Sequence, residues 1–354
     1  MVQINSINIT PPVLNSSCAW SSDLAQLKAL YESPFTGAVT TRTATLKGYK
    51  ENESHTFAFA NATVSSINSY GYSPHPLTTY LGWIEDILSS TTNPKPIIVS
   101  ITSDVDDPGS LASMVSQLQE LRRKIGDQAS NGNARIAIEL NTSCPNIKNA
   151  SPPGYNFGTL RPLLQVLSEA YASDPTLTIG LKLPPFVHGQ QFQSVLDEIT
   201  SLNSDTTLHI HNKVASIVNN PDPVGGTSSV VSFLTCTNTL GNSLLFADQI
   251  LSATSPSPPP SSTEQSNSNF ALPTVLGGLA GEALHPLALG NVYRFSQNLK
   301  GRKNSASRIK IIGVGGVTSL EARERMIRAG ADVVACATFF GKEGVKAFEI
   351  LTHP

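Results

Sequence analysis

The residues best suited to chemistry stand together in the segment Asn141-Thr-Ser-Cys-Pro-Asn146. An asparagine carboxamide both donates and accepts hydrogen bonds, so it can hold the edge of a planar polar ring. A cysteine acts as a base or a nucleophile through its thiolate. The combination predicts a planar polar substrate with one proton-transfer group, Cys144, beside it. The alternative is a polar loop that carries a buried structural cysteine.

The position of this segment in the chain supports the chemical interpretation. It follows the apolar run Arg135-Ile-Ala-Ile-Glu-Leu140, whose length and β-branched content predict a buried strand. Folds that alternate strands and helices place their chemistry just past the carboxyl ends of the strands. The thiol and the carboxamides therefore stand where a catalytic site is expected.

A second group of residues predicts a phosphate site near the end of the chain. The run Ile311-Ile-Gly-Val-Gly-Gly-Val317 indicates a strand that ends in a glycine pair, and Thr318 or Ser319 can cap the helix that follows. Backbone N–H groups at glycines can approach a phosphate, and the helix dipole favours the anion. The next strand ends at Thr338, and in TIM barrels the loops after the last two strands often form such a site. The alternative is a tight turn.

Polar groups also mark the ends of three other segments. Lys182 lies within the otherwise apolar run Gly180-Leu-Lys-Leu-Pro-Pro185. Burying a lysine without a partner is costly, so an inward Lys182 indicates an anion or an electron-rich cofactor atom. The alternative is a lysine that reaches solvent at the strand's end. A carboxamide between hydroxyls lies in Thr235-Cys-Thr-Asn-Thr-Leu-Gly241, and another glycine pair lies in Gly277-Gly-Leu-Ala-Gly281.

The bulk composition narrows the class of protein. The chain has 354 residues, 40% of them hydrophobic, and a formal net charge of -2. It can bury a large core, and the lack of Lys/Arg blocks argues against nucleic acid as a partner. It contains no run of about 18 apolar residues and no signal-peptide pattern, so we expect a cytoplasmic protein with no membrane span. The four cysteines show no metal-ligand spacing, so we expect no metal site and no disulfide scaffold.

The distribution of apolar runs predicts the fold. Strands are expected at residues 38–43, 64–68, 96–101, 135–141, 178–183, 230–237, 309–313 and 332–338. Helical spacing fills several gaps, as in Leu111-x-x-Met114-Val115-x-x-Leu118-x-x-Leu121 and at 322–329. Eight strands alternating with helices predict an α/β fold, a (β/α)₈ TIM barrel, with an open doubly wound sheet as the alternative. Residues 1–354 are expected to form one domain with insertions near 203–229 and 252–269, the second rich in Ser and Pro.

The motifs together resemble those of the class 1 dihydroorotate dehydrogenases, specifically the fumarate-linked class 1A. They stand in the family's order from Asn15 to Phe348, with the two insertions unmatched. The matching segments are Ser66-Ile-Asn-Ser-Tyr-Gly71, Asn141–Asn146, Gly180–Pro185, Thr237-Asn-Thr-Leu-Gly-Asn242, Gly277–Gly281 and Gly313-Val-Gly-Gly-Val317.

The resemblance implies a function and a set of site residues. It implies a TIM barrel that holds FMN and oxidises (S)-dihydroorotate to orotate in pyrimidine (UMP) biosynthesis, with fumarate as electron acceptor and a homodimeric state. Cys144 would take the proton from C5, and the hydride at C6 would pass to N5 of FMN. The implied substrate-binding residues are Arg42, Asn68, Tyr70, Gly71, Tyr72, Asn141, Asn146, Asn238 and Thr239. The implied cofactor-binding residues are Ser17, Arg42, Thr43, Asn141, Lys182, Thr237, Gly277, Gly278, Gly315, Gly316, Ala337 and Thr338.

Several positions depart from the family pattern. Arg42 stands where the family has lysine, Tyr70-Gly71-Tyr72 replaces Met-Gly-Leu, and Ala337 replaces glycine. Cys18 replaces glycine, so it is expected to approach the flavin. These departures leave two alternatives open: an FMN-dependent barrel oxidoreductase for another dihydropyrimidine or enone, and a catalytically weak flavin-binding paralogue. The electron acceptor is also open between fumarate and NAD reached through the partner subunit of class 1B enzymes.

Overall fold

The computed structural model describes most of the chain. The described residues are 1–91, 93–128, 132–144, 146–147, 152–215, 229–251, 269–302 and 305–353, with the backbone alone for 207–215 and 305.

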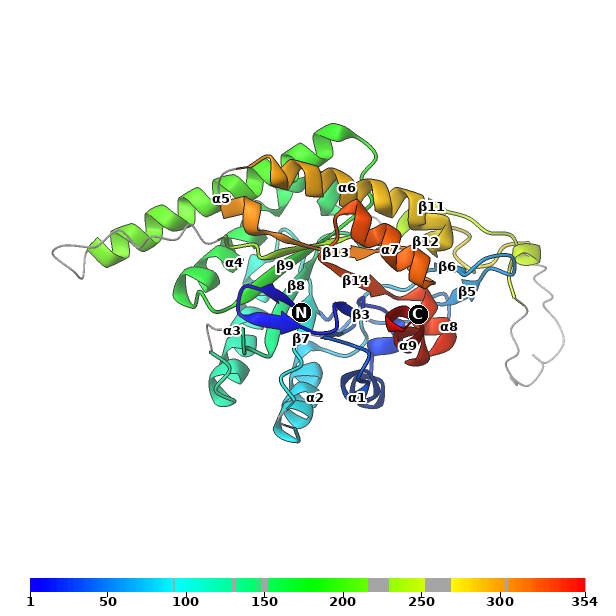
Figure 1. Ribbon diagram of the computed structural model, residues 1–354, viewed down its shortest axis with the longest axis horizontal. Helices are drawn as coiled ribbons and strands as arrows, with labels where there is room; N and C mark the ends of the chain where they lie inside the picture. The colour runs from blue at the N-terminus through cyan, green and yellow to red at the C-terminus, as the bar shows by residue number, and fades with distance from the viewer. Residues whose placement is uncertain are drawn as a thin grey trace.

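Within these ranges the central element is a sheet of eight parallel strands (Figure 1). In spatial order they are β3 (Val13–Asn15), β14 (Val333–Cys336), β13 (Lys310–Val314), β10 (Phe233–Cys236), β9 (Thr178–Leu183), β8 (Ile136–Asn141), β7 (Ile97–Ile101) and β4 (Val39–Thr40). A parallel bridge between Leu14 and Ala38 joins the first strand of this order to the last and closes the ring. The predicted barrel is therefore confirmed, and the open doubly wound alternative is wrong.

Helices surround the strands (Figure 1). They are α1 (Leu24–Glu32), α2 (Leu77–Ser89), α3 (Pro108–Lys124), α4 (Arg161–Ser173), α5 (Gly189–Ala215), α6 (His285–Lys300), α7 (Leu320–Ala329), α8 (Thr338–Glu343) and α9 (Lys346–Thr352). Short 3₁₀ turns are η1 (Ala19–Ser21), η2 (Pro153–Tyr155), η3 (Phe157–Leu160), η4 (Ala247–Gln249), η5 (Glu282–Leu284) and η6 (Ser305–Arg308). The helical spacing predicted from Leu111 to Leu121 lies in α3, and its apolar residues are buried.

Two small sheets complete the fold. The hairpin of β1 (Val2–Ile4) and β2 (Ile7–Ile9) contributes buried isoleucines to a cluster with barrel residues such as Phe233 and Ala137. An antiparallel sheet has the order β11 (Leu240–Ser243), β12 (Gly277–Gly281), β6 (Ser65–Asn68) and β5 (Phe57–Phe59). The first of these sheets thus supplies apolar core, and the second supplies residues to the site described below.

One of the eight predicted barrel strands is misplaced. Residues 65–68 form strand β6, but this strand belongs to the antiparallel sheet, where it pairs with β5 and β12. The barrel strand that the sequence prediction missed is β3. It is three residues long and follows Pro11-Pro12, so it is too short to show a periodic pattern.

The predicted insertions are only partly described. Residues 203–215, the first part of the insertion expected near 203–229, continue helix α5. Residues 216–228 lie outside the described residues, as do 252–268 of the second predicted insertion.

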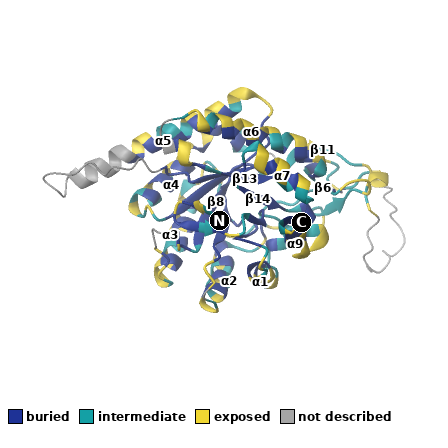
Figure 2. Cartoon of the chain, viewed as in Figure 1, coloured by how far each residue is buried: buried dark blue, intermediate teal, exposed yellow. Residues whose placement is uncertain are grey.

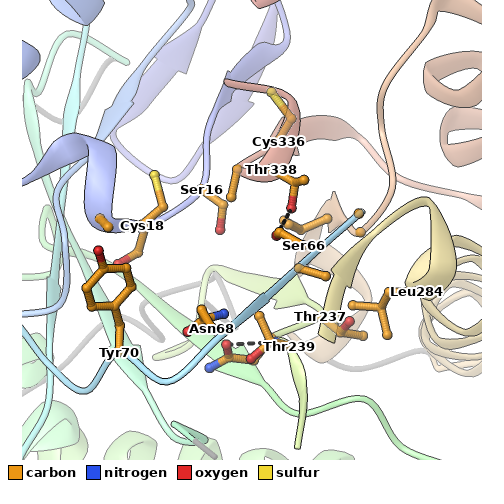
Figure 3. Close-up of a pocket in the computed structure, with 18 of the residues that line it drawn as sticks. Ser16, Cys18, Ser66, Asn68, Tyr70, Thr237, Thr239, Leu284, Cys336 and Thr338 are labelled. Atoms are coloured by element: carbon orange, nitrogen blue, oxygen red, sulfur yellow. Dashed lines mark hydrogen bonds between the residues drawn. The ribbon is translucent and has the colours of Figure 1, made fainter. Parts of the chain in front are cut away.

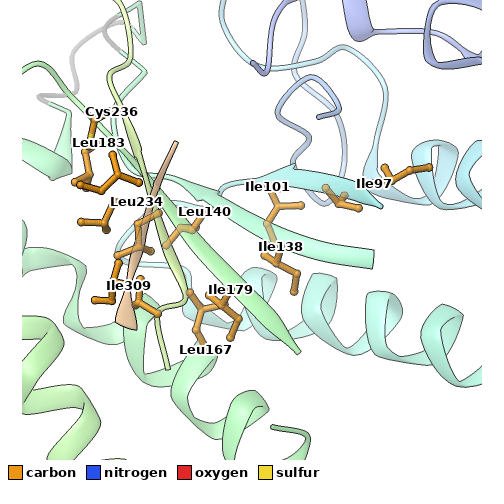
Figure 4. Close-up of a cluster of buried hydrophobic side chains, with 14 of the residues drawn as sticks. Ile97, Ile101, Ile138, Leu140, Leu167, Ile179, Leu183, Leu234, Cys236 and Ile309 are labelled. Carbon is orange, nitrogen blue, oxygen red and sulfur yellow. The ribbon is translucent and has the colours of Figure 1, made fainter. Parts of the chain in front are cut away.

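The two faces of the barrel strands carry different side chains. Figure 2 shows that the barrel strands are largely buried. Outward residues such as Ile138 and Ile179 pack against surrounding helices, for example against Leu167 of α4 (Figure 4). Each fully buried Ile or Leu contributes roughly 1.5–3 kcal/mol of apolar burial. The alternate residues face the barrel interior and become polar toward the carboxyl ends of the strands, as with Asn141 and Lys182. Apolar packing outside thus fixes the strands that present polar groups inside.

Gly180 is required by this interior packing. A Cβ atom at Gly180 would lie 2.1 Å from Cε2 of Phe233, whose ring is buried in the barrel interior. Gly82, in helix α2, has no atom within 4 Å of such a Cβ position.

We predict that Gly180→Ala lowers the free energy of unfolding by about 1–3 kcal/mol, because the added methyl group overpacks the barrel interior. Urea unfolding followed by circular dichroism measures the change. Gly82→Ala is the matched control and should be neutral or stabilising by up to about 1 kcal/mol. Equal stability of the two variants would contradict the packing described for Gly180.

Candidate active site

A cavity opens at the carboxyl ends of the barrel strands (Figure 3). Its empty volume, including the open mouth, is about 1040 Å³. Residues of β8, β9, β13 and β14 and the segment that follows β10 line it from the barrel, and β5, β6 and β12 line it from the antiparallel sheet. A hollow of this size at this end of a barrel is the usual place for a cofactor and its substrate.

Nearly all predicted site residues meet in this cavity. The predicted base and substrate-binding residues that line it are Cys144, Arg42, Asn68, Tyr70, Gly71, Tyr72, Asn141, Asn146, Asn238 and Thr239. The other predicted cofactor-binding residues that line it are Ser17, Thr43, Lys182, Thr237, Gly315, Gly316, Ala337 and Thr338.

Two predicted residues do not line the cavity. Gly278 pairs with Asn68 of β6, and Gly277 pairs with Ser243 of β11. A Cβ atom at Gly277 would lie 2.5 Å from the carbonyl oxygen of Asn68 in β6. This glycine therefore permits a close approach between two strands. The same motif reaches the cavity farther along, through Ala280 and Gly281.

The carboxamides of Asn141 and Asn238 form a fixed pair. Asn141 Nδ2 donates to Thr43 Oγ1 at 3.0 Å, and Asn141 Oδ1 accepts from Asn238 Nδ2 at 3.1 Å. Asn238 Nδ2 also donates to the carbonyl oxygen of Ser143 at 3.0 Å. Both side chains are buried, so these bonds define which atom of each amide faces which neighbour. The pair is organised before any ligand arrives.

A second asparagine pair joins the segment that carries Cys144 to the loop after β6. Asn146 Nδ2 donates to Asn68 Oδ1 at 3.0 Å and to the carbonyl oxygen of Tyr70 at 2.8 Å. Cys144 Sγ lies 3.8 Å from the same carbonyl oxygen. The thiol is thus held between two segments that both line the cavity.

The Cys144 thiol is partly enclosed by protein. Burial raises its pKa to about 11, although the N–H of Asn146 and the charges of Lys182 and Arg42 act in the opposite direction. The thiol is therefore protonated at neutral pH in the absence of a ligand. A base at this position must lose its proton before it can accept one.

We predict that iodoacetamide alkylates Cys144 slowly at about pH 7, because only about 10⁻⁴ of a thiol with this pKa is thiolate. The rate should rise about tenfold per pH unit to about pH 10. Mass spectrometry of the peptide that contains Cys144 measures the rate. The same peptide in urea-unfolded protein should level off above about pH 9, and a native rate that levels off there would contradict the burial effect.

Lys182 lies inside the cavity wall. Its side chain is buried, and Nζ donates to Ser16 Oγ at 3.0 Å and to the carbonyl oxygen of Ser17 at 3.3 Å. Both partners are uncharged, and an ammonium group has a third proton to donate. The alternative that Lys182 reaches solvent is therefore wrong. The nearby Thr237 Oγ1 is buried without a hydrogen-bond partner among the described residues, so both groups can still bind a polar ligand atom.

The glycine pair after β13 forms a tight cradle. Gly315 and Gly316 have φ angles of 128° and 66°, a region that favours glycine. A Cβ atom at Gly316 would lie 2.5 Å from Cβ of His285, at the start of α6. Beside the cradle, Ser66 Oγ and Thr338 Oγ1 lie 2.9 Å apart (Figure 3). Backbone N–H groups and hydroxyls in this arrangement suit a phosphate.

The predicted helix cap after this cradle is present. Ser319 Oγ accepts a hydrogen bond from the N–H of Ala322 at 3.2 Å and caps α7. His285 also contacts the cradle, since its Nδ1 lies within hydrogen-bonding distance, 2.7 Å, of the carbonyl oxygen of Gly315. The loop is thus fixed at both of its ends.

Several lining residues were not assigned from the sequence. They are Ser16, Ala19, Trp20, Phe57, Ser66, Ala280, Gly281, Leu284, Val314, Val317, Thr318, Cys336 and Phe339. The first three follow strand β3, so recognising that strand would have predicted them by position. Trp20 packs against Phe57, with ring centroids 5.2 Å apart. Cys18, which was expected near the cofactor, also lines the cavity.

The chain matches known proteins over most of its length. A family model described as dihydroorotate dehydrogenase matches residues 1–229 and 260–353. The chain is 28% identical over 318 residues to "Probable dihydroorotate dehydrogenase A (fumarate)" of Streptococcus pneumoniae serotype 4, covering 90% of this chain and 79% of that protein.

Proteins of two other streptococci bear the same enzyme name. The chain is 28% identical over 298 residues to one from Streptococcus pyogenes serotype M5, which covers 83% of this chain and 73% of that protein. It is 24% identical over 337 residues to one from Streptococcus agalactiae serotype Ia, and this match covers 95% of this chain and 86% of that protein. Among the helices that the structure describes, none has both the length and the apolar character to cross a bilayer.

Proposed function

The chain belongs to the dihydroorotate dehydrogenase family, and we propose on this basis that it oxidises (S)-dihydroorotate to orotate with FMN and passes the electrons to fumarate. The observation that carries the proposal is the meeting of three chemistries in one cavity. The Cys144 thiol, the paired carboxamides and the Gly315–Gly316 cradle all face the same space. A ring-shaped substrate and a phosphate-bearing cofactor need these groups together.

The cavity wall suits FMN in three respects. The cradle at Gly315–Gly316 and the hydroxyl of Thr338 suit its phosphate. Thr237 Oγ1 has no hydrogen-bond partner in the part of the chain that the structure describes, and Lys182 offers a buried cation that would stabilise negative charge on a flavin ring. FMN, when bound, supplies the group that accepts a hydride from the substrate.

The chain's own residues would bind the substrate and move its proton. The carboxamides of Asn68, Asn141, Asn146 and Asn238 would hold the polar edge of the pyrimidine ring. Cys144 Sγ would accept the proton from C5. Because burial raises the pKa of this thiol to about 11, the turnover rate should climb with pH through pH 9.

The first test is anaerobic mixing of the purified yellow protein with dihydroorotate. We predict that the flavin absorbance bleaches and returns on addition of fumarate. Cys144→Ala is the matched control: it should stay yellow and unreduced, because it lacks the base but keeps the cofactor contacts. A Cys144→Ala protein that bleaches as fast as the wild type would refute the assignment of Cys144.

We further predict that Lys182→Ala loses FMN more readily, by roughly tenfold or more in dissociation constant, because a buried charge-assisted contact is removed. Quenching of free FMN fluorescence by apoprotein measures this affinity without any turnover. Lys310→Ala is the matched control. Lys310 lies at the amino end of β13, the end away from the cavity, and its Nζ pairs with the Asp332 carboxylate at 2.9 Å. Equal FMN affinity in the two variants would remove Lys182 from the cofactor site.

A second candidate function rests on Arg42. The guanidinium group of Arg42 forms an ion pair with Glu51, which neutralises the charge expected to meet a substrate carboxylate. This favours an FMN-dependent oxidoreductase for an uncharged dihydropyrimidine or enone. Yellow protein that dihydroorotate fails to bleach, but that an uncharged analogue reduces, would support this candidate. The homodimer implied by the resemblance and the cytoplasmic location expected from the sequence remain part of the main proposal.

A further inference from the structure

Arg42 is the most heavily engaged charged residue of the cavity wall. Its Nη2 donates to the Glu51 carboxylate, to the carbonyl oxygen of Tyr72 at 3.2 Å and to that of Gly71 at 3.4 Å. The guanidinium carbon also lies 5.0 Å from the ring centre of Tyr70. Only 6% of Arg42 is exposed. One nitrogen therefore serves three acceptors, and the carboxylate is the charged one.

The remaining donors of Arg42 are less occupied. Nη1 makes a single long contact, 3.5 Å, with Ser22 Oγ. A guanidinium group has five N–H donors in a planar fork that matches a carboxylate. Arg42 could thus hold a ligand carboxylate, but Glu51 already supplies one.

The loop that carries Glu51 is fastened to the cavity wall. The N–H of Tyr49 donates to the carbonyl oxygen of Ser73 at 2.8 Å, and the rings of Tyr49 and Tyr72 lie 5.8 Å apart. A Cβ atom at Gly71 would lie 2.4 Å from Cε1 of Tyr49, so the two segments are in close contact. Glu51 is therefore presented to Arg42 by a packed loop.

The charge of Glu51 affects the pKa values of tyrosines at and beside the cavity. It raises the pKa of Tyr49 and of Tyr70, in each case after the larger effect of burial. The charge of Arg42 lowers the pKa of Tyr70 and of Cys144. The two side chains thus act on the same cavity with opposite signs.

We propose that Glu51 is a positioning residue that acts through Arg42 and sets the preference of the site for charged substrates. Its carboxylate holds the guanidinium group against the Tyr70–Tyr72 loop and cancels its charge. A substrate carboxylate must compete with this internal one. The inference rests on the proposed function, because it concerns the same substrate site.

The test compares ligand binding to the oxidised FMN-bound protein, followed by the flavin spectrum. Glu51→Gln should bind orotate about tenfold tighter than the wild type, because the competing charge is gone while the side chain keeps its shape. Uracil, which lacks the carboxylate, should bind both proteins equally. In turnover, the KM for dihydroorotate should fall and kcat should change little.

Two further variants separate charge from loop structure. Glu53→Gln removes the same charge from an exposed side chain two residues on, and it should bind orotate like the wild type. Glu51→Asp keeps the carboxylate and should also stay near the wild type. A loosened loop would instead alter uracil binding in Glu51→Gln.

Each outcome decides a different question. Orotate binding that is equal or weaker in Glu51→Gln overturns the inference and leaves the proposed function standing. Tighter binding of orotate and uracil alike also overturns it, because the effect would not depend on charge. Orotate that binds neither protein overturns the proposed substrate and the inference together.

Discussion

Closure of the barrel is the constraint on which the site depends. Strand β3 pairs with β14 on one side and meets Ala38 through a single bridge on the other. Through this closure, the residues after β3 come next to the end of β9, where Lys182 Nζ reaches Ser16 and Ser17. In an open sheet, β3 would be an edge strand separated from β9 by β14, β13 and β10. The cavity wall is continuous because a three-residue strand completes the ring.

The alternation of side chains along the strands turns this ring into a binding site. Outward residues bury apolar surface against the helices and supply much of the stability. Inward residues are freed from that role, and near the carboxyl ends they are polar. They satisfy one another where they can, as Asn141 and Asn238 do, and buried networks of this kind are rigid when complete. In the cavity wall, Thr237 Oγ1 has no such partner among the described residues.

The sequence predicted the fold class and most of the cavity wall, because strand ends carry a local signal. Asn141 and Thr338 follow apolar runs and Lys182 lies near the end of another, and position alone placed them at one end of a barrel. Strand β3 escaped prediction because three residues carry no period. The strand contact of Gly277 was not predicted, because a glycine that permits strand contact looks the same in sequence as one that approaches a phosphate. The contact of Glu51 with Arg42 could not be predicted from the sequence, because it joins two loops whose approach is set by tertiary packing.

Lys182 has a further proton to donate, and Thr237 Oγ1 has no hydrogen-bond partner among the described residues. A ligand that binds these groups affects how much of the protein a cell maintains. A ligand that binds only the folded chain stabilises it by RT ln(1 + [L]/Kd), about 2.7 kcal/mol when its concentration is a hundred times Kd. A folded chain with empty hydrogen-bonding positions in its wall lacks this contribution and spends more time open to proteases. Under the proposed function this ligand is FMN, so the abundance of the protein would follow the supply of that cofactor.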